Sequence, residues 1–302
     1  MIYCNYRNEG VENMLSRVYV EIGNICNLSC SFCPKTKRAP RQMSVAEFRC
    51  VCEKLSGVCE NVFLHVMGEP LLHPDLPTLI DVAAEHSLKV HITTNGTLLP
   101  KLSDALVERA DKIARVSISL HAPEGNGREE SLAPYISGAV GFAKRFSAAG
   151  GFSVFRLWNL DSAEASGKNG LNSYIESVLH DEYTGEWSAR YSGFRMAERT
   201  FIEYDGVFVW PSESKADEVE CGTCHALRSQ VAILVDGTVV PCCLDSEGNM
   251  PLGNIFEKNL DDILKDRAVK EMRQGFERGV YTAELCKKCT YARRFHVKGK
   301  KQ

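Results

Sequence analysis

The sequence predicts an α/β protein built as a partial (β/α)6 TIM-like barrel, followed by a small C-terminal region with a β-hairpin and a helix. Two observations support this prediction. Short β-rich apolar runs alternate with helical patterns six times, which favours parallel βαβ units. The pattern changes after Trp210, where the polar and acidic residues 212–220 resemble a linker. We therefore expect a barrel over residues 1–211 and a second region over residues 212–302.

The predicted barrel strands are rich in β-branched and aromatic residues and span residues 17–22, 61–66, 89–93, 115–120, 152–157 and 201–210. Helices are expected between them over residues 44–56, 75–86, 99–110, 135–149 and 173–180. Ser44 and Glu47 have the spacing of a capping box, which places the start of the first helix. In the second region, two apolar runs around Asp236-Gly237 predict a β-hairpin, and residues 259–278 predict one amphipathic helix.

The overall composition excludes several classes of protein. Hydrophobic residues make up 44% and charged residues 25% of the 302, which is ordinary for a globular protein and unlike a disordered, collagen-like or coiled-coil chain. No apolar run approaches the roughly 18 residues of a membrane span, and the first ten residues lack the apolar core of a secretory signal. The formal charge of −3 gives no overall attraction to nucleic acid or anionic membranes. We therefore expect a cytoplasmic protein that binds neither nucleic acid nor membranes.

Cysteine is the unusual component, with 13 residues in the chain. A long chain without a secretory signal favours metal ligation over disulfides. Cys26, Cys30 and Cys33 follow the first predicted strand with C-x3-C-x2-C spacing, and loops after barrel strands open on the catalytic face. Three thiolates on a [4Fe–4S] cluster would leave one iron open for a ligand, because full ligation takes four. A zinc knuckle with a distant His, or packed core thiols, would be the alternatives.

With Phe32 as the aromatic residue, C-x3-C-x-aromatic-C resembles the signature of the radical S-adenosylmethionine (radical SAM) enzymes. Three further segments follow successive predicted strands as in that family: Met67-Gly68-Glu69-Pro70, Thr94-Asn95-Gly96 and Ser117-Ile118-Ser119. The resemblance implies that Cys26, Cys30 and Cys33 hold the SAM-binding [4Fe–4S] cluster. It also implies that SAM is bound with contributions from Phe32, Gly68, Glu69, Asn95, Ser117 and Ser119.

The same resemblance implies the reaction. The open iron would chelate the amino and carboxylate groups of SAM, and one electron would break the sulfonium S–C5′ bond. The resulting 5′-deoxyadenosyl radical would take a hydrogen atom from the substrate, while the barrel supplies positioning and a dry site. An electron donor such as flavodoxin or ferredoxin is the implied protein partner.

The cysteines of the last third form a second pattern. Cys224 is followed by twelve residues, Gly237, four residues and Cys242, and Cys286-Lys-Lys-Cys289 comes later. This resembles the auxiliary-cluster domain of the SPASM group in its shortened twitch form, which would bind one auxiliary [4Fe–4S] cluster. The implied ligands are Cys224, Cys242, Cys286 and Cys289. Either neighbour, Cys221 or Cys243, could replace a ligand, and a zinc ribbon built from Cys221/Cys224 and Cys286/Cys289 is the alternative.

Three residues are candidates for contact with the substrate. His121 shares a strand face with Ser117 and Ser119 by period two, although a solvated loop histidine fits equally well. Arg156 on the fifth strand could recognise a carboxylate or phosphate, or could pair with a barrel carboxylate. Glu203 on the sixth strand could likewise contact the substrate or form a salt bridge within the barrel. His65 and His91 could instead be core histidines.

Two enzymatic functions fit these patterns. The first is a radical SAM enzyme acting on a small molecule, by bond cleavage (as a lyase, for example on a modified purine such as queuine) or by dehydrogenation. The second is a peptide-modifying maturase of the kind that acts on ribosomally made peptides or sulfatases. Only 25 residues precede Cys26, too few for a separate peptide-recognition domain, which favours the small molecule. A non-enzymatic iron–sulfur carrier is disfavoured, because it would not need Gly68-Glu69-Pro70.

Overall fold

The computed structural model describes residues 15–127, 132–159, 170–206, 208–214 and 216–295. Its strands form one 11-stranded sheet with the order β11-β10-β9-β1-β2-β3-β4-β5-β8-β7-β6. The centre of the sheet is six parallel strands: β1 (Arg17–Val20), β2 (Asn61–Phe63), β3 (Lys89–Thr94), β4 (Ile113–Ser119), β5 (Ser153–Asn159) and β8 (Thr200–Gly206). The predicted α/β fold with a partial (β/α)6 barrel is confirmed.

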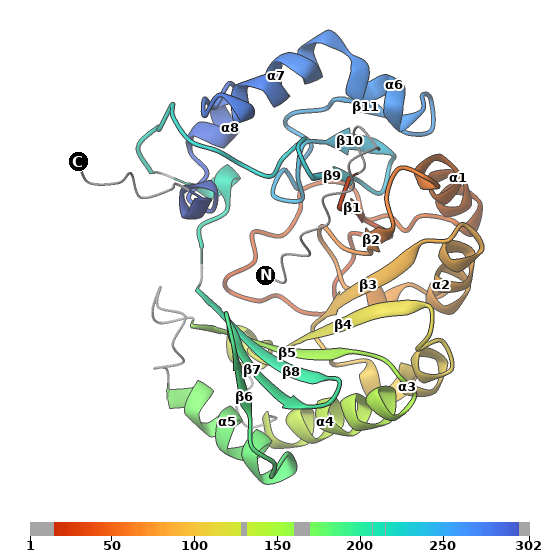
Figure 1. Ribbon diagram of the computed structural model, residues 1–302, viewed down its shortest axis with the longest axis vertical. Coiled ribbons are helices and arrows are strands. Elements are labelled where there is room, and N and C mark those ends of the chain that lie inside the picture. The colour runs from red at the N-terminus through yellow and green to blue at the C-terminus, as the bar shows by residue number, and fades with distance from the viewer. Residues whose placement is uncertain (1–14, 128–131, 160–169, 207, 215, 296–302) are drawn as a thin grey trace.

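Helices cover one side of this curved sheet (Figure 1). They are α1 (Val45–Leu55), α2 (Leu76–Glu85), α3 (Leu99–Val107), α4 (Leu132–Ala148) and α5 (Gly170–Glu182). Along β1, Val18 and Val20 are buried, while the alternating residues Arg17 and Tyr19 keep partial exposure. Because side chains alternate across a strand, the apolar residues pack under the helices and the others lie on the opposite face, called here the inner face.

The first helix begins as its sequence predicts. The Ser44 hydroxyl accepts a hydrogen bond from the Glu47 backbone N–H at 3.2 Å, and the Glu47 carboxylate accepts one from the Ser44 N–H at 2.8 Å. This capping box satisfies two backbone donors that the helix itself leaves unpaired. Phe48, Val51, Cys52 and Leu55 then form the buried face of α1.

The two strands before β8 were not anticipated from the sequence. After α5 the chain forms an antiparallel hairpin of β6 (Ser188–Arg190) and β7 (Gly193–Ala197), and β7 pairs antiparallel with β8. The predicted β-hairpin around Asp236-Gly237 is present as β9 (Gln230–Ile233) and β10 (Thr238–Val240). β9 also pairs in parallel with β1, so the C-terminal region extends the sheet of the barrel, ending in β11 (Gly253–Asn254).

The single helix predicted over residues 259–278 is wrong. The structure has two helices there, α6 (Leu260–Lys265) and α7 (Arg267–Glu277). Asp266 between them has a non-helical backbone, with φ −54° and ψ 144°, and its carboxylate accepts a hydrogen bond from the Ala268 N–H at 2.9 Å. Aspartate is a favourable N-cap residue. Asp266 therefore ends the first helix and begins a second one, although the helical periodicity of the sequence continues through it. The short α8 (Glu284–Lys287) follows.

Candidate functional site

The first cysteine motif lies in the loop that follows β1, at the end of the sheet where β2, β3 and β4 also end. Cys26 is exposed, and Cys30 and Cys33 are half-buried. Burial raises the pKa of the Cys26 thiol, and so do the nearby Glu69, Cys30 and Cys33, because each favours a neutral thiol beside it. The three thiols are therefore close enough to interact, as ligands of one cluster must be.

Hydrogen-bond donors surround these sulfur atoms. The Leu28 backbone N–H lies 3.4 Å from the Cys26 sulfur, and the Asn95 amide nitrogen lies 3.9 Å from it. The Asn126 amide nitrogen lies 3.2 Å from the Cys30 sulfur. N–H groups aimed at sulfur stabilise thiolates and tune the reduction potential of a bound cluster, so this loop fits an iron–sulfur cluster with three cysteine ligands.

Phe32 fixes the shape of the cysteine loop. Its ring packs against His121, with ring centroids 4.8 Å apart, and a Cβ atom added to Gly125 would lie 2.4 Å from the ring. The loop backbone is held on the same turn by a hydrogen bond from the Ser31 N–H to the Gly125 carbonyl at 2.8 Å. Only a glycine at position 125 allows the aromatic residue of the motif to approach this closely.

Glu69 joins the second and third motif segments. Its buried carboxylate accepts hydrogen bonds from the Thr94 hydroxyl at 2.6 Å, the Asn95 N–H at 2.7 Å and the Leu71 N–H at 3.0 Å. Burial raises its pKa to about 6, against which these three donors act. The carboxylate is thus engaged within the protein, where it holds the segment after β2 against the segment after β3.

The backbone around Gly68 meets the cysteine loop directly. Gly68 has φ +80°, and a Cβ there would lie 2.4 Å from the Gly23 carbonyl oxygen. The next residue, Glu69, donates its N–H to the Ile25 carbonyl at 2.9 Å. A side chain at position 68 would separate the two segments, which explains the need for glycine.

Tyr135 of α4 is a site residue that the sequence analysis missed. Its hydroxyl lies 2.7 Å from the Asn95 carbonyl oxygen and 2.8 Å from the Ser119 carbonyl oxygen, so it connects the third and fourth segments. The Asn95 side chain itself bonds the Asn27 amide at 2.9 Å. Ser117 is buried and Ser119 half-buried at the same end of β4. The structure therefore brings together the residues that the resemblance assigned to SAM binding.

The C-terminal cysteines form a second group. Cys286 and Cys289 are buried, and half-buried Cys224 and Cys242 pack against the same core. Burial raises the pKa of Cys286 to about 12, with added contributions from Cys224 and Cys289. Burial also raises the pKa of Cys242 well above its ordinary value, with contributions from its chain neighbour Cys243 and from Cys224 and Cys286. The four predicted ligands pack against one core and influence one another electrostatically, and their soft sulfur donors suit an iron–sulfur cluster.

Cys221 and Cys243 are placed differently. Cys221 is exposed, and its backbone forms an isolated antiparallel β-bridge with Val280. Cys243 packs against a separate apolar cluster that includes Val66 and Met67, where its thiol is hydrogen-bonded to the Tyr19 hydroxyl. Adjacent residues 242 and 243 thus face two different surroundings.

The three substrate candidates occupy the inner face or its edge. His121 is buried, 2% exposed, between Phe32 and Trp158, and burial lowers its pKa to about 3. Arg156 and Glu203 are in register on neighbouring strands β5 and β8. Arg156 lies 3.9 Å from the Asp205 carboxylate, and Glu203 pairs at 3.3 Å with Arg115, which the sequence analysis did not single out.

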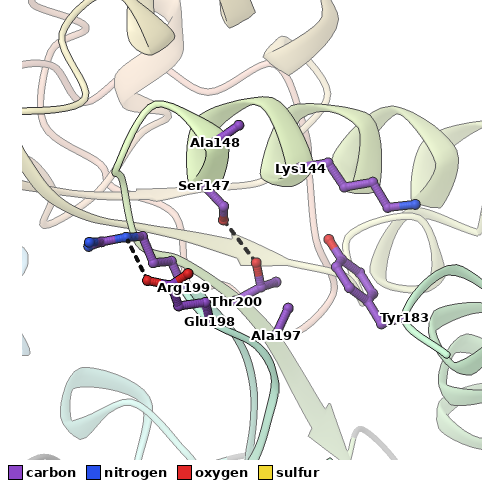
Figure 2. Close-up of a pocket in the computed structure, with 8 residues that line it drawn as sticks. All are labelled: Lys144, Ser147, Ala148, Tyr183, Ala197, Glu198, Arg199 and Thr200. Atoms are coloured by element: carbon purple, nitrogen blue, oxygen red, sulfur yellow. Dashed lines mark hydrogen bonds and ion pairs between the residues drawn. The ribbon is translucent and has the colours of Figure 1, made fainter. Parts of the chain in front are cut away.

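A shallow hollow elsewhere on the molecule is drawn in Figure 2. It is lined by Lys144, Ser147, Ala148, Tyr183, Ala197, Glu198, Arg199 and Thr200. These residues come from the end of α4, the position after α5, and the turn from β7 into the beginning of β8, so the hollow lies at the opposite end of β8 from the cysteine loop. It contains none of the predicted site residues.

Comparisons with known proteins agree with this geometry. The radical SAM superfamily model matches residues 20–151, and the SPASM iron–sulfur cluster-binding domain matches residues 224–290. The GTP 3′,8-cyclase of Chlorobaculum tepidum is 40% identical over 96 residues, which are 30% of this chain and only 29% of that enzyme. The S-adenosyl-L-methionine-dependent 2-deoxy-scyllo-inosamine dehydrogenase of Niallia circulans is 23% identical over 288 residues, 92% of this chain and 94% of the relative.

Solved structures show the same fold. BtrN in complex with AdoMet and 2-DOIA superposes with a TM-score of 0.58 at 20% identity, over 93% of this chain and 94% of BtrN. Streptococcus suis SuiB bound to its precursor peptide SuiA gives a TM-score of 0.59 at 18% identity, over 92% of this chain and 72% of SuiB. Among the described residues, no helix is long and apolar enough to cross a membrane. The chain is a radical SAM enzyme with a C-terminal SPASM domain.

Proposed function

We propose that this enzyme reductively cleaves SAM and removes a hydrogen atom from a small-molecule substrate, so that the substrate is dehydrogenated or one of its bonds is cleaved. The observation that carries the proposal is the convergence of four segments at one end of the sheet. The cysteine loop, Gly68-Glu69 and Asn95 are joined there by direct hydrogen bonds, and the Tyr135 hydroxyl links Asn95 to the end of β4.

Each segment has a role in this proposal. Cys26, Cys30 and Cys33 would hold the [4Fe–4S] cluster, which, when bound with SAM, supplies the 5′-deoxyadenosyl radical. Gly68 lets the segment after β2 reach the cysteine loop, and Glu69 fixes it against Thr94 and Asn95. The backbone groups of this rigid frame would then position SAM before any reaction, which is how an enzyme lowers the entropic part of a barrier.

Cys224, Cys242, Cys286 and Cys289 would hold one auxiliary [4Fe–4S] cluster. Four cysteine ligands leave no iron free to bind substrate, so this cluster would transfer electrons or stabilise the domain. Reducing equivalents would come from a donor such as flavodoxin or ferredoxin.

The extent of the similarity favours a small-molecule substrate. The dehydrogenase is matched over 94% of its length, whereas the structures solved with a peptide are matched less fully, SuiB over 72% and anSMEcpe over 87%. The inner face next to the SAM segments also carries charged side chains, which suit a polar small molecule. Peptide modification is the alternative, supported by the likeness to SuiB.

Cysteine variants test the proposed cleavage of SAM. Cys26→Ala, Cys30→Ala and Cys33→Ala should each abolish the formation of 5′-deoxyadenosine from SAM and dithionite in anaerobically reconstituted protein. The protein should still fold, because the buried core lies elsewhere. Cys50→Ala, on α1 and outside both cysteine groups, is the matched control and should retain activity. Undiminished 5′-deoxyadenosine in the three variants would refute the proposal.

A further inference from the structure

Three arginines from three strands lie close together on the inner face. Arg17 comes from β1, Arg115 from β4 and Arg156 from β5. Arg115 lies 3.3 Å from Glu203, and Glu203 is in register with Arg156 on the neighbouring strand, which brings Arg115 and Arg156 to the same part of the face. Burial lowers the pKa of Arg115, the Glu203 charge raises it, and the positive charges of Arg156 and Arg17 lower it. The Arg115 side chain is 31% exposed and that of Arg156 25%, so both are reachable from solvent.

Carboxylates in the described part of the chain do not balance these charges. Glu203 lies 3.3 Å from Arg115, in a single contact that leaves most of the guanidinium donors free. Asp205 lies 3.9 Å from Arg156 but only 2.8 Å from Arg294, which takes the shorter contact. Arg17 has an aromatic neighbour, with its guanidinium 5.9 Å from the centre of the Phe63 ring. Partly buried positive charges without enough partners are unfavourable, so the face is suited to an added anion.

The histidines of this face do not contribute charge. Burial and the neighbouring arginines lower the pKa of His65 and of His91 to about 3, so both rings are neutral at physiological pH. The His91 Nε2 lies 2.9 Å from the Asn61 amide oxygen and must carry the proton there. The excess of positive charge therefore belongs to the arginines alone.

An unpaired donor lies beside them. The buried indole N–H of Trp158 has no acceptor among the residues the structure describes. The Arg156 guanidinium lies 5.4 Å from the centre of the same indole ring. A buried donor without a partner is unfavourable, so an acceptor supplied by a ligand would stabilise it. Guanidinium and indole N–H groups together match the oxygen atoms of a carboxylate or phosphate.

We propose that the substrate carries an oxyanion, a carboxylate or a phosphate, which binds on the inner face to Arg115 and Arg156. This inference rests on the proposed function, because it names the chemical class of the molecule from which the hydrogen atom is removed.

The two arginines start from different levels of the inner face. Arg115 precedes Ser119 by four residues on β4, which is about 13 Å along a strand. Arg156 is in register with Ser119, at the end where the SAM segments meet. The Arg115 side chain reaches Glu203, whose backbone is in register with Arg156, so the two arginines serve the same part of the face. An anion held there would place the rest of the substrate next to the SAM segments.

Calorimetry tests the proposal on the reconstituted holoenzyme saturated with SAM, so that the carboxylate of SAM is already accommodated. The probes are ribose 5-phosphate, gluconate and neutral ribose. At least one charged probe should bind more tightly than ribose, and the stronger of the two identifies phosphate or carboxylate. Arg115→Met should weaken that binding by about tenfold, because a charge-assisted contact is lost.

Glu203→Gln makes the test specific. This change removes the competing negative charge, so the charged probe should bind several-fold more tightly, in the direction opposite to Arg115→Met. Arg267→Met, in an exposed ion pair on α7, should change nothing. Equal affinity for ribose and both anions would overturn the proposal, and so would equal weakening by both inner-face variants, which indicates a merely structural pair. Formation of 5′-deoxyadenosine, measured separately, reports on the proposed function and not on this inference.

Discussion

The guanidinium of Arg38 binds the carboxylate of Glu21 with both terminal nitrogens, at 2.6 and 2.8 Å. Glu21 is fully buried, and its oxygens also accept hydrogen bonds from the Met67 N–H at 3.1 Å and the Val235 N–H at 3.0 Å. Arg38 in turn donates from Nε to the Ser246 carbonyl at 2.9 Å. One carboxylate thus connects the cysteine loop, the segment before Gly68 and the C-terminal hairpin, and so links the two predicted cluster sites.

Glu21→Gln should lower the free energy of unfolding by about 3 kcal/mol, because breaking a buried ion pair leaves a charge without its partner. Anaerobic urea unfolding followed by circular dichroism measures the change. Glu271→Gln is the control, since its pair with Arg267 is exposed and should contribute less than about 0.5 kcal/mol. A similar small effect in both variants would show that the Glu21 network does not stabilise the fold.

Iron content should distinguish one auxiliary cluster from zinc. The reconstituted protein should contain about eight iron and eight sulfide per chain, as two [4Fe–4S] clusters. Replacing Cys26, Cys30 and Cys33 together should leave about four iron; with zinc at the second site, the same variant would hold no iron and about one zinc. Metal analysis and electron paramagnetic resonance separate these outcomes.

The ligand register of the second group can be tested by two single changes. Cys221→Ala and Cys243→Ala should both retain the auxiliary cluster, because Cys221 is exposed and Cys243 faces Tyr19. Cys242→Ala should lose it. Loss of four iron in either of the first two variants would assign the ligand to the neighbouring cysteine.

Glu69→Ala should weaken SAM binding by about tenfold or more, measured by calorimetry. The change leaves the Thr94 hydroxyl and the Asn95 and Leu71 N–H groups without their acceptor, so the SAM segments lose their alignment. Glu85→Ala, on the exposed end of α2, should have no effect on SAM affinity. Unchanged affinity in Glu69→Ala would remove Gly68-Glu69-Pro70 from the SAM site.

Histidine burial predicts a loss of stability in mild acid. Because the pKa of His91 is about 3 in the folded protein and 6.5 ordinarily, the unfolded chain binds an extra proton below pH 6.5. Stability should therefore fall as the pH falls through this range. His91→Gln removes that proton, so the slope of unfolding free energy against pH between 6 and 5 should decrease by about 1 kcal/mol per pH unit. Equal slopes would mean that His91 is protonated in the folded protein.

Much of the fold was predictable because its signals are local. The Ser44–Glu47 capping box, the Asp236-Gly237 turn and the alternation of strands with helices each depend on residues within a few positions of one another. The cysteine spacings are local in the same sense, and they were sufficient to indicate both predicted cluster sites. Asp266 shows the limit of such patterns, since its capping preference outweighed a helical periodicity that continued through it.

By itself, the sequence determined the barrel, the enzyme superfamily and the two groups of cysteines, because these follow from short-range spacing and residue type. Only the tertiary structure decided that β9 joins β1, that Cys242 and Cys243 pack against two different apolar clusters, and that Arg115 contacts Glu203 opposite Arg156. These relationships join residues as far as 213 positions apart, as Arg17 and Gln230 are, and the pairing of distant strands depends on the packing of the whole sheet rather than on any local preference.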